Sequence, residues 1–453
     1  GRQCSVITYH KWFINFYLPS IINIDLDLSK FIFCPLISII VPTYNTPVQY
    51  LVELVDSIVA QSYPNWELCF ADGASSEIET LAKLKEYVEL NSNIKVAFLD
   101  ENLHISGNSN AALKLAGGDY IALMDHDDTL TPNALFEVVK AINLTDAEFI
   151  YSDEDKQEMD GTYCEPHYKS DYSPELLHSQ NYMSHLGVIK KSLIDAVGGF
   201  EIGLEGSQDY DLYLKVAEKT TKIYHIQKVL YHWRKVPGST AAVFSDKSYA
   251  QEAGRKALEN ALYRRGISGE VFDGKYPGTY RVKYKIHCNP LVSIIIPFKD
   301  KPELLKMCLD SILDKTTYDN FEIIGVSNNS EESATFALMQ TYQNKHQRIK
   351  FIEHNVSFNF SEINNYAVNH YASGEHIVLL NNDIEVITPD WIESLLEFSQ
   401  RDDVGAVGAR LYYPNDTLQH AGVIIGIGSI AGHLQKYMGK DEFGYFLRPH
   451  LIQ

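Results

Sequence analysis

The 453-residue sequence predicts an α/β fold in two tandem copies, each a mostly parallel, twisted sheet flanked by helices, with the second copy incomplete. The first observation behind this prediction is an internal repeat. The segment PLISIIVPTYN at Pro35 is nearly repeated by PLVSIIIPFKD at Pro290, and the matched Pro42 and Pro297 are 255 residues apart. The second observation is that continuous apolar strands alternate with amphipathic helices, which is typical of parallel sheets covered on both faces.

Each copy begins with the same elements in the same order. A β-branched strand stops at a proline, an amphipathic helix follows, and a second apolar strand ends in polar residues. We expect these elements at residues 38–41, 51–61 and 67–71 in the first copy, and at residues 293–296, 302–314 and 322–326 in the second. Ligands of such sheets bind beyond the carboxyl ends of the strands, so the polar residues at those ends are the candidates for function.

The repeat also divides the chain into segments. We expect an N-terminal extension, a first copy, a β-rich connector and a second copy, at residues 1–34, 35–266, 267–289 and 290–453. The first copy has 232 residues and the second has 164, so the last third of the second copy is expected to be missing.

The composition is typical of a globular protein, with 45% hydrophobic and 22% charged residues. The formal net charge is -20, and no run of Lys or Arg could follow a phosphate backbone, so nucleic acid is not an expected partner. Six scattered cysteines form no CxxC pair, which favours reduced thiols and a cytoplasmic location.

The most apolar early stretch, residues 12–24, is interrupted by a proline and several polar residues. It is shorter than the roughly 20 residues of a membrane-spanning helix, and no small-x-small cleavage site follows it. Neither a transmembrane helix nor a signal peptide is therefore expected. A peripheral contact with the inner face of a membrane through this stretch remains an alternative.

The stretch ALMDHDDTL, residues 122–130, is an apolar run that ends in three carboxylates and an imidazole. Asp125 and Asp127 form a plausible site for Mg²⁺ or Mn²⁺, because carboxylate oxygens suit these ions and two close acids repel unless a cation lies between them. Asp128 is expected instead to cap or charge the first turn of the following helix. His126 is expected to be a bystander, because imidazole and carboxylate do not favour the same ion.

Other polar residues have both a functional and a structural interpretation. Asp72, in FADGASS, ends a strand and is either a ligand contact or a plain Asx-turn. Asn110 lies in ENLHISGNSNAAL, where small residues would let a ligand approach the backbone. Arg234, in YHWRKVPGST, either neutralises a leaving diphosphate or belongs to a solvated turn. Of Asp209 and Asp211, one is expected at a helix N-terminus, and the other could act as a general base.

Six motifs occur in order: SIIVPTYN, FADGAS, ENLHISGNSNAALKLAGGDYIALMDHDD, YSDEDK, GSQDYDL and YHWRKVPGST. Together they resemble family 2 glycosyltransferases with the Rossmann-like GT-A fold, in particular the tandem bacterial enzymes that build O-antigen, rhamnan and other surface polysaccharides. The resemblance covers nearly all of the chain from Pro35 onward. It implies a nucleotide-diphosphate sugar as donor, a glycan or lipid-linked glycan as acceptor, and Mn²⁺ or Mg²⁺ as cofactor.

The resemblance also implies roles for individual residues. Asp209 is expected to be the catalytic base of an inverting transfer, although Gln208 stands where many relatives have Glu. Asp127 is expected to bind the metal that bridges the diphosphate, and His232 is expected near the metal. Donor binding is expected from Pro42, Thr43, Tyr44, Asn45, Asp72, Asn110, Asp125 and Arg234.

The resemblance therefore implies an inverting, metal-dependent glycosyltransferase that extends a surface polysaccharide or O-antigen. Asp209 would deprotonate an acceptor hydroxyl, which then attacks the donor sugar. The acids of YSDEDK, Asp153 to Asp155, would help to place the acceptor or form a solvated acidic loop. One alternative is a non-catalytic sugar-binding or scaffold component. Another is a nucleotidyltransferase, for which a basic glycine-rich loop is lacking.

The second copy departs from the pattern. Ser327 replaces Asp72, and Asn381 and Asp383 replace Asp125 and Asp127. In addition, Phe298-Lys299-Asp300 replaces Thr43-Tyr44-Asn45. With one charge fewer, the second copy should bind a cation more weakly, and the segment that would carry its base would lie beyond Gln453. The first copy is therefore expected to hold the working site.

Overall fold

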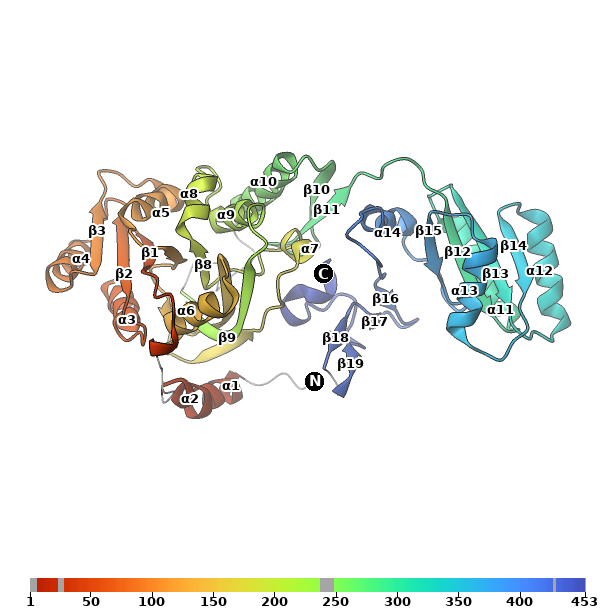
Figure 1. The fold of residues 1–453 in the computed structure, drawn as a ribbon, viewed down its shortest axis with the longest axis horizontal. Coiled ribbons are helices and arrows are strands. Elements are labelled where there is room, and N and C mark those ends of the chain that lie inside the picture. Colours follow the sequence, from red (N-terminus) through yellow and green to blue (C-terminus); the bar gives the residue numbers. More distant parts are fainter. Residues whose placement is uncertain (1–5, 23–27, 237–247, 427–428, 453) are drawn as a thin grey trace. The chain divides into compact units, whose positions relative to one another are not determined.

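The computed structural model describes residues 6–22, 28–236, 248–426 and 429–452, and it forms two compact units (Figure 1). The first unit comprises Gly1–Val282 and Asp441–Gln453, and the second comprises Lys283–Lys440. Each unit contains a sheet with flanking helices, so the predicted α/β fold class is confirmed.

The first unit contains a nine-stranded sheet in the order β3-β2-β1-β4-β8-β6-β9-β5, with β7 paired to β6. Its strands are β1 (Ile37–Thr43), β2 (Trp66–Asp72), β3 (Ile94–Phe98), β4 (Tyr120–Leu123), β5 (Thr129–Leu130), β6 (Phe149–Gln157), β7 (Tyr163–His167), β8 (Gly187–Lys190) and β9 (Ile223–Arg234). The half formed by β3, β2, β1 and β4 is parallel, as the sequence predicts. The other half is mixed, because β8 runs antiparallel to both β4 and β6.

Helices flank this sheet (Figure 1). They are α3 (Val48–Val59), α4 (Ile78–Leu90), α5 (His104–Leu115), α6 (Ala134–Thr145), α7 (Pro174–Leu177), α8 (Lys191–Val197), α9 (Gln208–Ala217) and α10 (Ser248–Arg264). In α3, apolar side chains at helical spacing form one buried stripe, at Leu51, Leu54, Val55 and Ile58. This stripe belongs to the same core as Ile37, Ile39 and Val41 of β1, so the predicted strand and helix pack together.

The N-terminal extension forms α1 (Val6–Trp12), the π-helix η1 (Phe13–Tyr17) and α2 (Leu18–Ile22), and a 3₁₀ turn, η2 (Leu28–Lys30), follows. Tyr9 and Phe13 are buried and cluster with Val229 of β9, and Tyr163 of β7 packs against this cluster. The extension is therefore part of the folded first unit. In the described part of the chain, no helix has both the length and the apolar character needed to cross a membrane.

The second unit contains a four-stranded parallel sheet in the order β14-β13-β12-β15. Its main elements are β12 (Val292–Phe298), α11 (Pro302–Lys315), β13 (Phe321–Ser327), α12 (Ser333–Lys345), β14 (Ile349–Glu353), α13 (Phe360–Tyr371), β15 (His376–Leu379) and α14 (Trp391–Ser399). Two small hairpins follow, formed by β16 (Leu411–Tyr412) with β17 (Leu418–His420) and by β18 (Val423–Ile425) with β19 (Ala431–His433).

Two further segments lie near the positions in the sequence where one unit ends and the other begins. The expected connector contains the paired strands β10 (Gly269–Asp273) and β11 (Tyr280–Tyr284). The 3₁₀ segment η4 (Tyr445–His450) belongs to the first unit, where the Tyr445 hydroxyl donates to the Pro166 carbonyl over 2.9 Å. The five described cysteines are free thiols, at Cys34, Cys69, Cys164, Cys288 and Cys308.

The repeat extends to single hydrogen bonds. The Ser38 hydroxyl donates to Glu67 over 2.6 Å, joining β1 to β2. The matched Ser293 hydroxyl donates to Glu322 over the same 2.6 Å, joining β12 to β13. Two strands and their buried polar link have therefore been duplicated together.

Candidate active site

The acidic loop Asp125–Asp128 connects β4 to β5, and its last acid is an interior anchor. Asp128 is fully buried. Its carboxylate accepts the Tyr231 hydroxyl over 2.5 Å and the Arg234 backbone N–H over 2.7 Å, both from β9. Burial raises the pKa of Asp128 well above its usual range. The expectation that Asp128 caps a helix is wrong, because α6 begins at Ala134 and β5 lies in between.

The other two acids of the loop lie closer to solvent. The Asp125 side chain is 38% exposed, and its backbone N–H donates to the Tyr231 hydroxyl over 3.2 Å. Asp127 is partly buried, and its carbonyl accepts the Arg234 Nε–H over 2.7 Å. Burial raises the pKa of Asp127, and the negative charge of Asp125 raises it further, against the opposing effect of His126. A partly exposed carboxylate beside a second acid whose pKa is raised by burial suits a divalent cation.

His185, which the sequence analysis did not select, lies beside this loop. Its Nε2 is 3.9 Å from the Asp125 carboxylate. Among the described residues, Asp125, Asp128 and His185 each offer a ligand atom within 4.8 Å of the others. The sequence feature that could have identified His185 as a site residue is its position just before the apolar segment of β8. Because β8 runs antiparallel to β4, residues that precede β8 lie beside residues that follow β4.

Asp209 and Asp211 both lie in the first turn of α9, but in different surroundings. Asp211 is fully buried and pairs with Lys215 over 2.7 Å. The Asp209 carboxylate accepts the Asn181 side-chain amide over 2.8 Å. Burial raises the pKa of Asp209, His185 opposes this shift, and Asp125 adds to it. The pKa of Asp209, the candidate base, is therefore sensitive to His185 and to Asp125 of the acidic loop.

The turn after β1 and the turn after β2 are joined by polar contacts. Both carboxylate oxygens of Asp72 bind Ser75, one through the backbone N–H at 2.9 Å and one through the hydroxyl at 2.5 Å. The Thr43 hydroxyl is 3.4 Å from Asp72. Asn45 adopts a φ of 48° and accepts the Ser76 N–H over 2.8 Å. Asp72 therefore shapes the turn directly, as the structural interpretation of its motif predicts.

Of the residues at the end of β1, Tyr44 presents the most side-chain surface. It is 48% exposed, whereas Thr43 is buried and Pro42 pairs with Ala71 of β2. An exposed aromatic ring at a carboxyl strand end is available to stack on a nucleotide base.

Two other predicted site residues have protein partners that define their surroundings. Both ends of the Asn110 amide bind the backbone of Phe200, at 2.8 and 3.0 Å. The Arg234 guanidinium is buried and pairs with Glu53 over 2.5 Å, so it does not lie in a solvated turn. The remainder of that motif, residues 237–240, lies outside the described part of the chain.

His232, predicted near the metal, lies in a different cluster. It is 4% exposed, and its Nδ1 is 2.5 Å from Asp155. Its ring packs edge-on against Phe13 at 5.3 Å and, with a tilt of 35°, against Tyr163 at 4.3 Å. Two described groups could hold a cation, one with Asp125, Asp128 and His185 and one with Glu158, Cys164 and Glu165, and neither contains His232. The contacts of His232 are thus with Asp155 and with Phe13 of the N-terminal extension.

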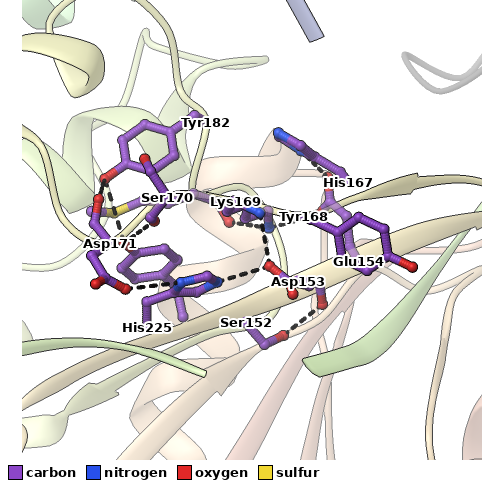
Figure 2. A network of polar contacts seen from close by, with 12 residues as sticks. Ser152, Asp153, Glu154, His167, Tyr168, Lys169, Ser170, Asp171, Tyr182 and His225 are labelled. Carbon is purple, nitrogen blue, oxygen red and sulfur yellow. Dashed lines mark hydrogen bonds and ion pairs between the residues drawn. The ribbon is translucent and has the colours of Figure 1, made fainter. Parts of the chain in front are cut away.

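The acids of YSDEDK are not a solvated loop, which corrects that interpretation. Asp153, Glu154 and Asp155 are consecutive buried residues of β6. Figure 2 shows His225 between Asp153 and Asp171, with its nitrogens at 2.8 and 3.3 Å from their carboxylates. Asp155 accepts the Tyr9 hydroxyl over 2.8 Å.

Glu154 contacts an ammonium and an imidazole in the same interior (Figure 2). Its carboxylate is 3.1 Å from the Lys169 ammonium and 3.5 Å from the His167 ring. Burial would raise the pKa of Glu154, but Lys169 and His167 lower it to about 2. Burial also lowers the pKa of His167, to about 4, against the opposing effect of Glu154. The pair keeps a carboxylate ionised inside the unit.

A model of the glycosyl transferase family 2 matches residues 38–202 and 293–445, which is more than half of the chain. The chain is 45% identical over 423 residues to the uncharacterised protein y4gI of Sinorhizobium fredii, covering 92% of this chain and 46% of that protein. It is 38% identical over 400 residues to the O-antigen biosynthesis protein RfbC of Myxococcus xanthus, covering 88% of this chain and 31% of that protein. The chain thus spans less than half the length of these curated relatives.

Among solved structures, the chain is similar to the mannosyltransferase PcManGT of Pyrobaculum calidifontis in complex with GDP-Man and Mn²⁺. The identity is 16% and the TM-score 0.40, covering 60% of this chain and 76% of that one.

Proposed function

The chain belongs to the glycosyl transferase family 2, and we propose that its first copy is an inverting, metal-dependent glycosyltransferase. It moves a sugar from a nucleotide-diphosphate sugar to a growing surface polysaccharide or O-antigen acceptor. The observation that carries this proposal is the segment 181–185, in which Asn181 donates to Asp209 over 2.8 Å and His185 lies 3.9 Å from the Asp125 carboxylate. This segment supports one shared site for the base candidate at the start of α9 and the donor-site candidate beyond β4.

In this mechanism, Asp209 accepts the proton of an acceptor hydroxyl. The acceptor oxygen forms a bond to the anomeric carbon of the donor sugar, and the bond from that carbon to the diphosphate breaks on the opposite face. The raised pKa of Asp209 strengthens it as a base. The Asn181 amide fixes one carboxylate oxygen, which orients the group.

Asp125 and Asp127 are the residues that would hold the Mn²⁺ or Mg²⁺. They fit a hard divalent cation, because Asp125 is partly exposed and the pKa of Asp127 is raised by burial and by Asp125. A cation bound there supplies neutralisation of the negative charge on the departing diphosphate. Arg234 supports the loop from behind through the Asp127 carbonyl.

For the rest of the donor, we propose that Tyr44 stacks on the nucleotide base. Its half-exposed ring follows β1, and the turn beside it is held by Asp72 and Ser75. The proposed acceptor class, a glycan or lipid-linked glycan, rests on the similarity to an O-antigen biosynthesis protein. We also propose that the protein acts in the cytoplasm, with a peripheral contact at the inner face of the membrane through residues 12–24.

The proposal is tested by the release of nucleoside diphosphate. The full chain is first screened with UDP-, dTDP- and GDP-sugars by thermal shift, with and without Mn²⁺. With the stabilising donor, wild-type protein should release nucleoside diphosphate. Asp209→Asn should lower that release by roughly 10²- to 10⁴-fold while the donor still binds, because only the base is lost.

Two outcomes would contradict the proposal. Release by neither form, with donor bound by both, would indicate a sugar-binding or scaffold protein instead. Release of pyrophosphate rather than nucleoside diphosphate would indicate a nucleotidyltransferase. If no donor stabilised the protein in a metal-dependent way, the assignment of Asp127 would be wrong.

A further inference from the structure

The His185 side chain has a fixed orientation between the two halves of the proposed site. Its ring stacks on Tyr231 at 4.5 Å with 14° between the planes, and it lies edge-on to Trp233 at 5.3 Å. The Nε2 atom is on the Asp125 side, at 3.9 Å from the carboxylate. Two rings from β9 therefore direct one nitrogen toward the donor acid.

The backbone on both sides of this ring is held from the interior. The Lys169 ammonium donates to the Met183 carbonyl over 2.6 Å and to the His185 carbonyl over 2.5 Å. It also donates to Glu154 over 3.1 Å, and Glu154 accepts the His185 N–H over 3.0 Å. The ammonium thus has three acceptors for its three hydrogens, and its side chain is fully buried. This pair fixes the segment that carries His185 (Figure 2 shows Lys169 and Glu154).

The same segment, residues 181–185, reaches the base candidate. Asn181 donates to Asp209 over 2.8 Å. The Ser184 hydroxyl donates to the Asn181 carbonyl over 3.1 Å, and the Tyr213 hydroxyl of α9 donates to the Ser184 carbonyl over 2.7 Å. One short segment therefore contacts Asp125 through His185 and Asp209 through Asn181.

Resting on the proposed function, we propose that His185 binds the sugar that is transferred, through its Nε2. The ring lies 3.9 Å from Asp125, and the segment that carries it contacts Asp209, which are the two residues proposed to bind the donor and to activate the acceptor. Within the described part of the chain, Nδ1 is buried and has no hydrogen-bond partner. No protein contact there fixes the tautomer, so Nε2 can donate to or accept from a sugar hydroxyl as the substrate requires.

A metal ligand is the competing role for His185, and the contacts of Asp128 disfavour it. Both oxygens of Asp128 already accept hydrogen bonds from β9. That leaves Asp125 as the partner of the imidazole in this group, and Mg²⁺ and Mn²⁺ prefer oxygen ligands. His185 is therefore assigned to the sugar rather than to the cation.

The test compares binding of a nucleoside diphosphate with binding of the matching nucleotide sugar. Calorimetry with the full chain and MnCl₂ measures the affinity for UDP, dTDP and GDP and compares each with the affinity for the corresponding nucleotide sugar. His185→Ala should lower the affinity for the nucleotide sugar by about tenfold, because one hydrogen bond to the sugar is lost. The affinity for the nucleoside diphosphate should stay unchanged. His185→Gln, which keeps a polar group at the end of the side chain, should recover part of this affinity. Equal weakening of both ligands would assign His185 to the metal or diphosphate, and no weakening of either would reject a binding role.

The control is His178→Gln, which alters another buried histidine of the first unit, whose Nε2 is 3.4 Å from Arg265. It should change neither affinity. If wild-type protein bound none of the nucleoside diphosphates, the proposed function itself would fail. Normal wild-type binding and release with no effect of His185→Ala would overturn only the assignment of His185.

Discussion

The two copies keep the same scaffold and differ in what surrounds it. In the first, Asn45 has a φ of 48° and its N–H donates to the Ser75 hydroxyl over 2.7 Å. In the second, Asp300 has a φ of 52° and its N–H donates to the Ser330 hydroxyl over 3.1 Å. The turn after the first strand is therefore preserved even though its residues have changed.

The polar ends of the strands have diverged. Asp72, which binds Ser75 through both oxygens, is replaced by Ser327, whose hydroxyl is 2.9 Å from that of Ser330. The loop after β15 carries Asn381 and Asp383, and both are exposed. In the described part of the second unit, β15 is an edge strand of the parallel sheet, whereas the matching β4 also pairs with β8.

This difference shows where the properties of the first site originate. Asp128 is buried by Tyr231 and Arg234 of β9, and His185 precedes β8. Those strands belong to the mixed half of the sheet. The parallel strand β4 leads into the acidic loop, and the mixed half supplies the strand that buries Asp128 and thereby raises its pKa.

The largest effect on stability is expected where the mixed half buries charges. Lys169→Met leaves Glu154 buried without its ammonium, so the first unit should lose about 3–5 kcal/mol of unfolding free energy. Hydrogen exchange of peptides from β6 and β9 measures this loss, and peptides from β12 and β13 serve as the reference. The double variant with Glu154→Gln should recover part of the stability. Equal changes in both units would contradict a local role.

Acid should destabilise the same interior. The folded pKa of His167 is lowered to about 4, mainly by burial, so the unfolded chain takes up the proton first as the pH falls. The contribution of neutral His167 to the unfolding free energy is fully present above about pH 6.5. It is lost as the pH falls toward 4, by up to about 3 kcal/mol. Hydrogen exchange of β6 at pH 7 and pH 4.5 would measure this. His167→Gln should reduce the pH dependence, and an unchanged slope would assign it to other groups.

A smaller effect separates the two acidic loops. Asp127→Asn should weaken Mn²⁺-dependent donor binding by at least about tenfold, because one negative charge is removed from a partly buried site. The matched Asp383→Asn changes an exposed residue and should leave the affinity unchanged. Calorimetry with and without MnCl₂ measures the donor affinity of both variants and shows which acidic loop binds the cation. A larger loss for Asp383→Asn would place the working site in the second copy.

The smallest effects should be equal in the two copies. Ser38→Ala and Ser293→Ala each remove a matched hydrogen bond to a glutamate and the matched acceptor of a glycine N–H. Each should cost its own unit about 1–2 kcal/mol, as measured by exchange of the strands that it joins. A clearly unequal pair would show that the scaffold has diverged along with the site.

The sequence predicted what is local and repeated. Strand β1, helix α3, strand β2 and the acidic loop follow from periodicity and from the spacing between copies. It did not predict His185 or the true role of Asp128, because both depend on antiparallel and distant pairings. Asp128 meets Tyr231 from another strand, and no local pattern around an acid reveals a partner so far along the chain.

The contacts of Tyr9 bear on how the protein can be shortened. The repeat begins near Pro35, which makes that residue the obvious place to start a minimal enzyme. The Tyr9 hydroxyl, however, binds Asp155, and Phe13 covers His232. A version that began at Pro35 would expose the buried contact between Asp155 and His232, together with an apolar patch, to water. The start of the repeat thus differs from the start of the folded first unit, which includes Tyr9 and Phe13.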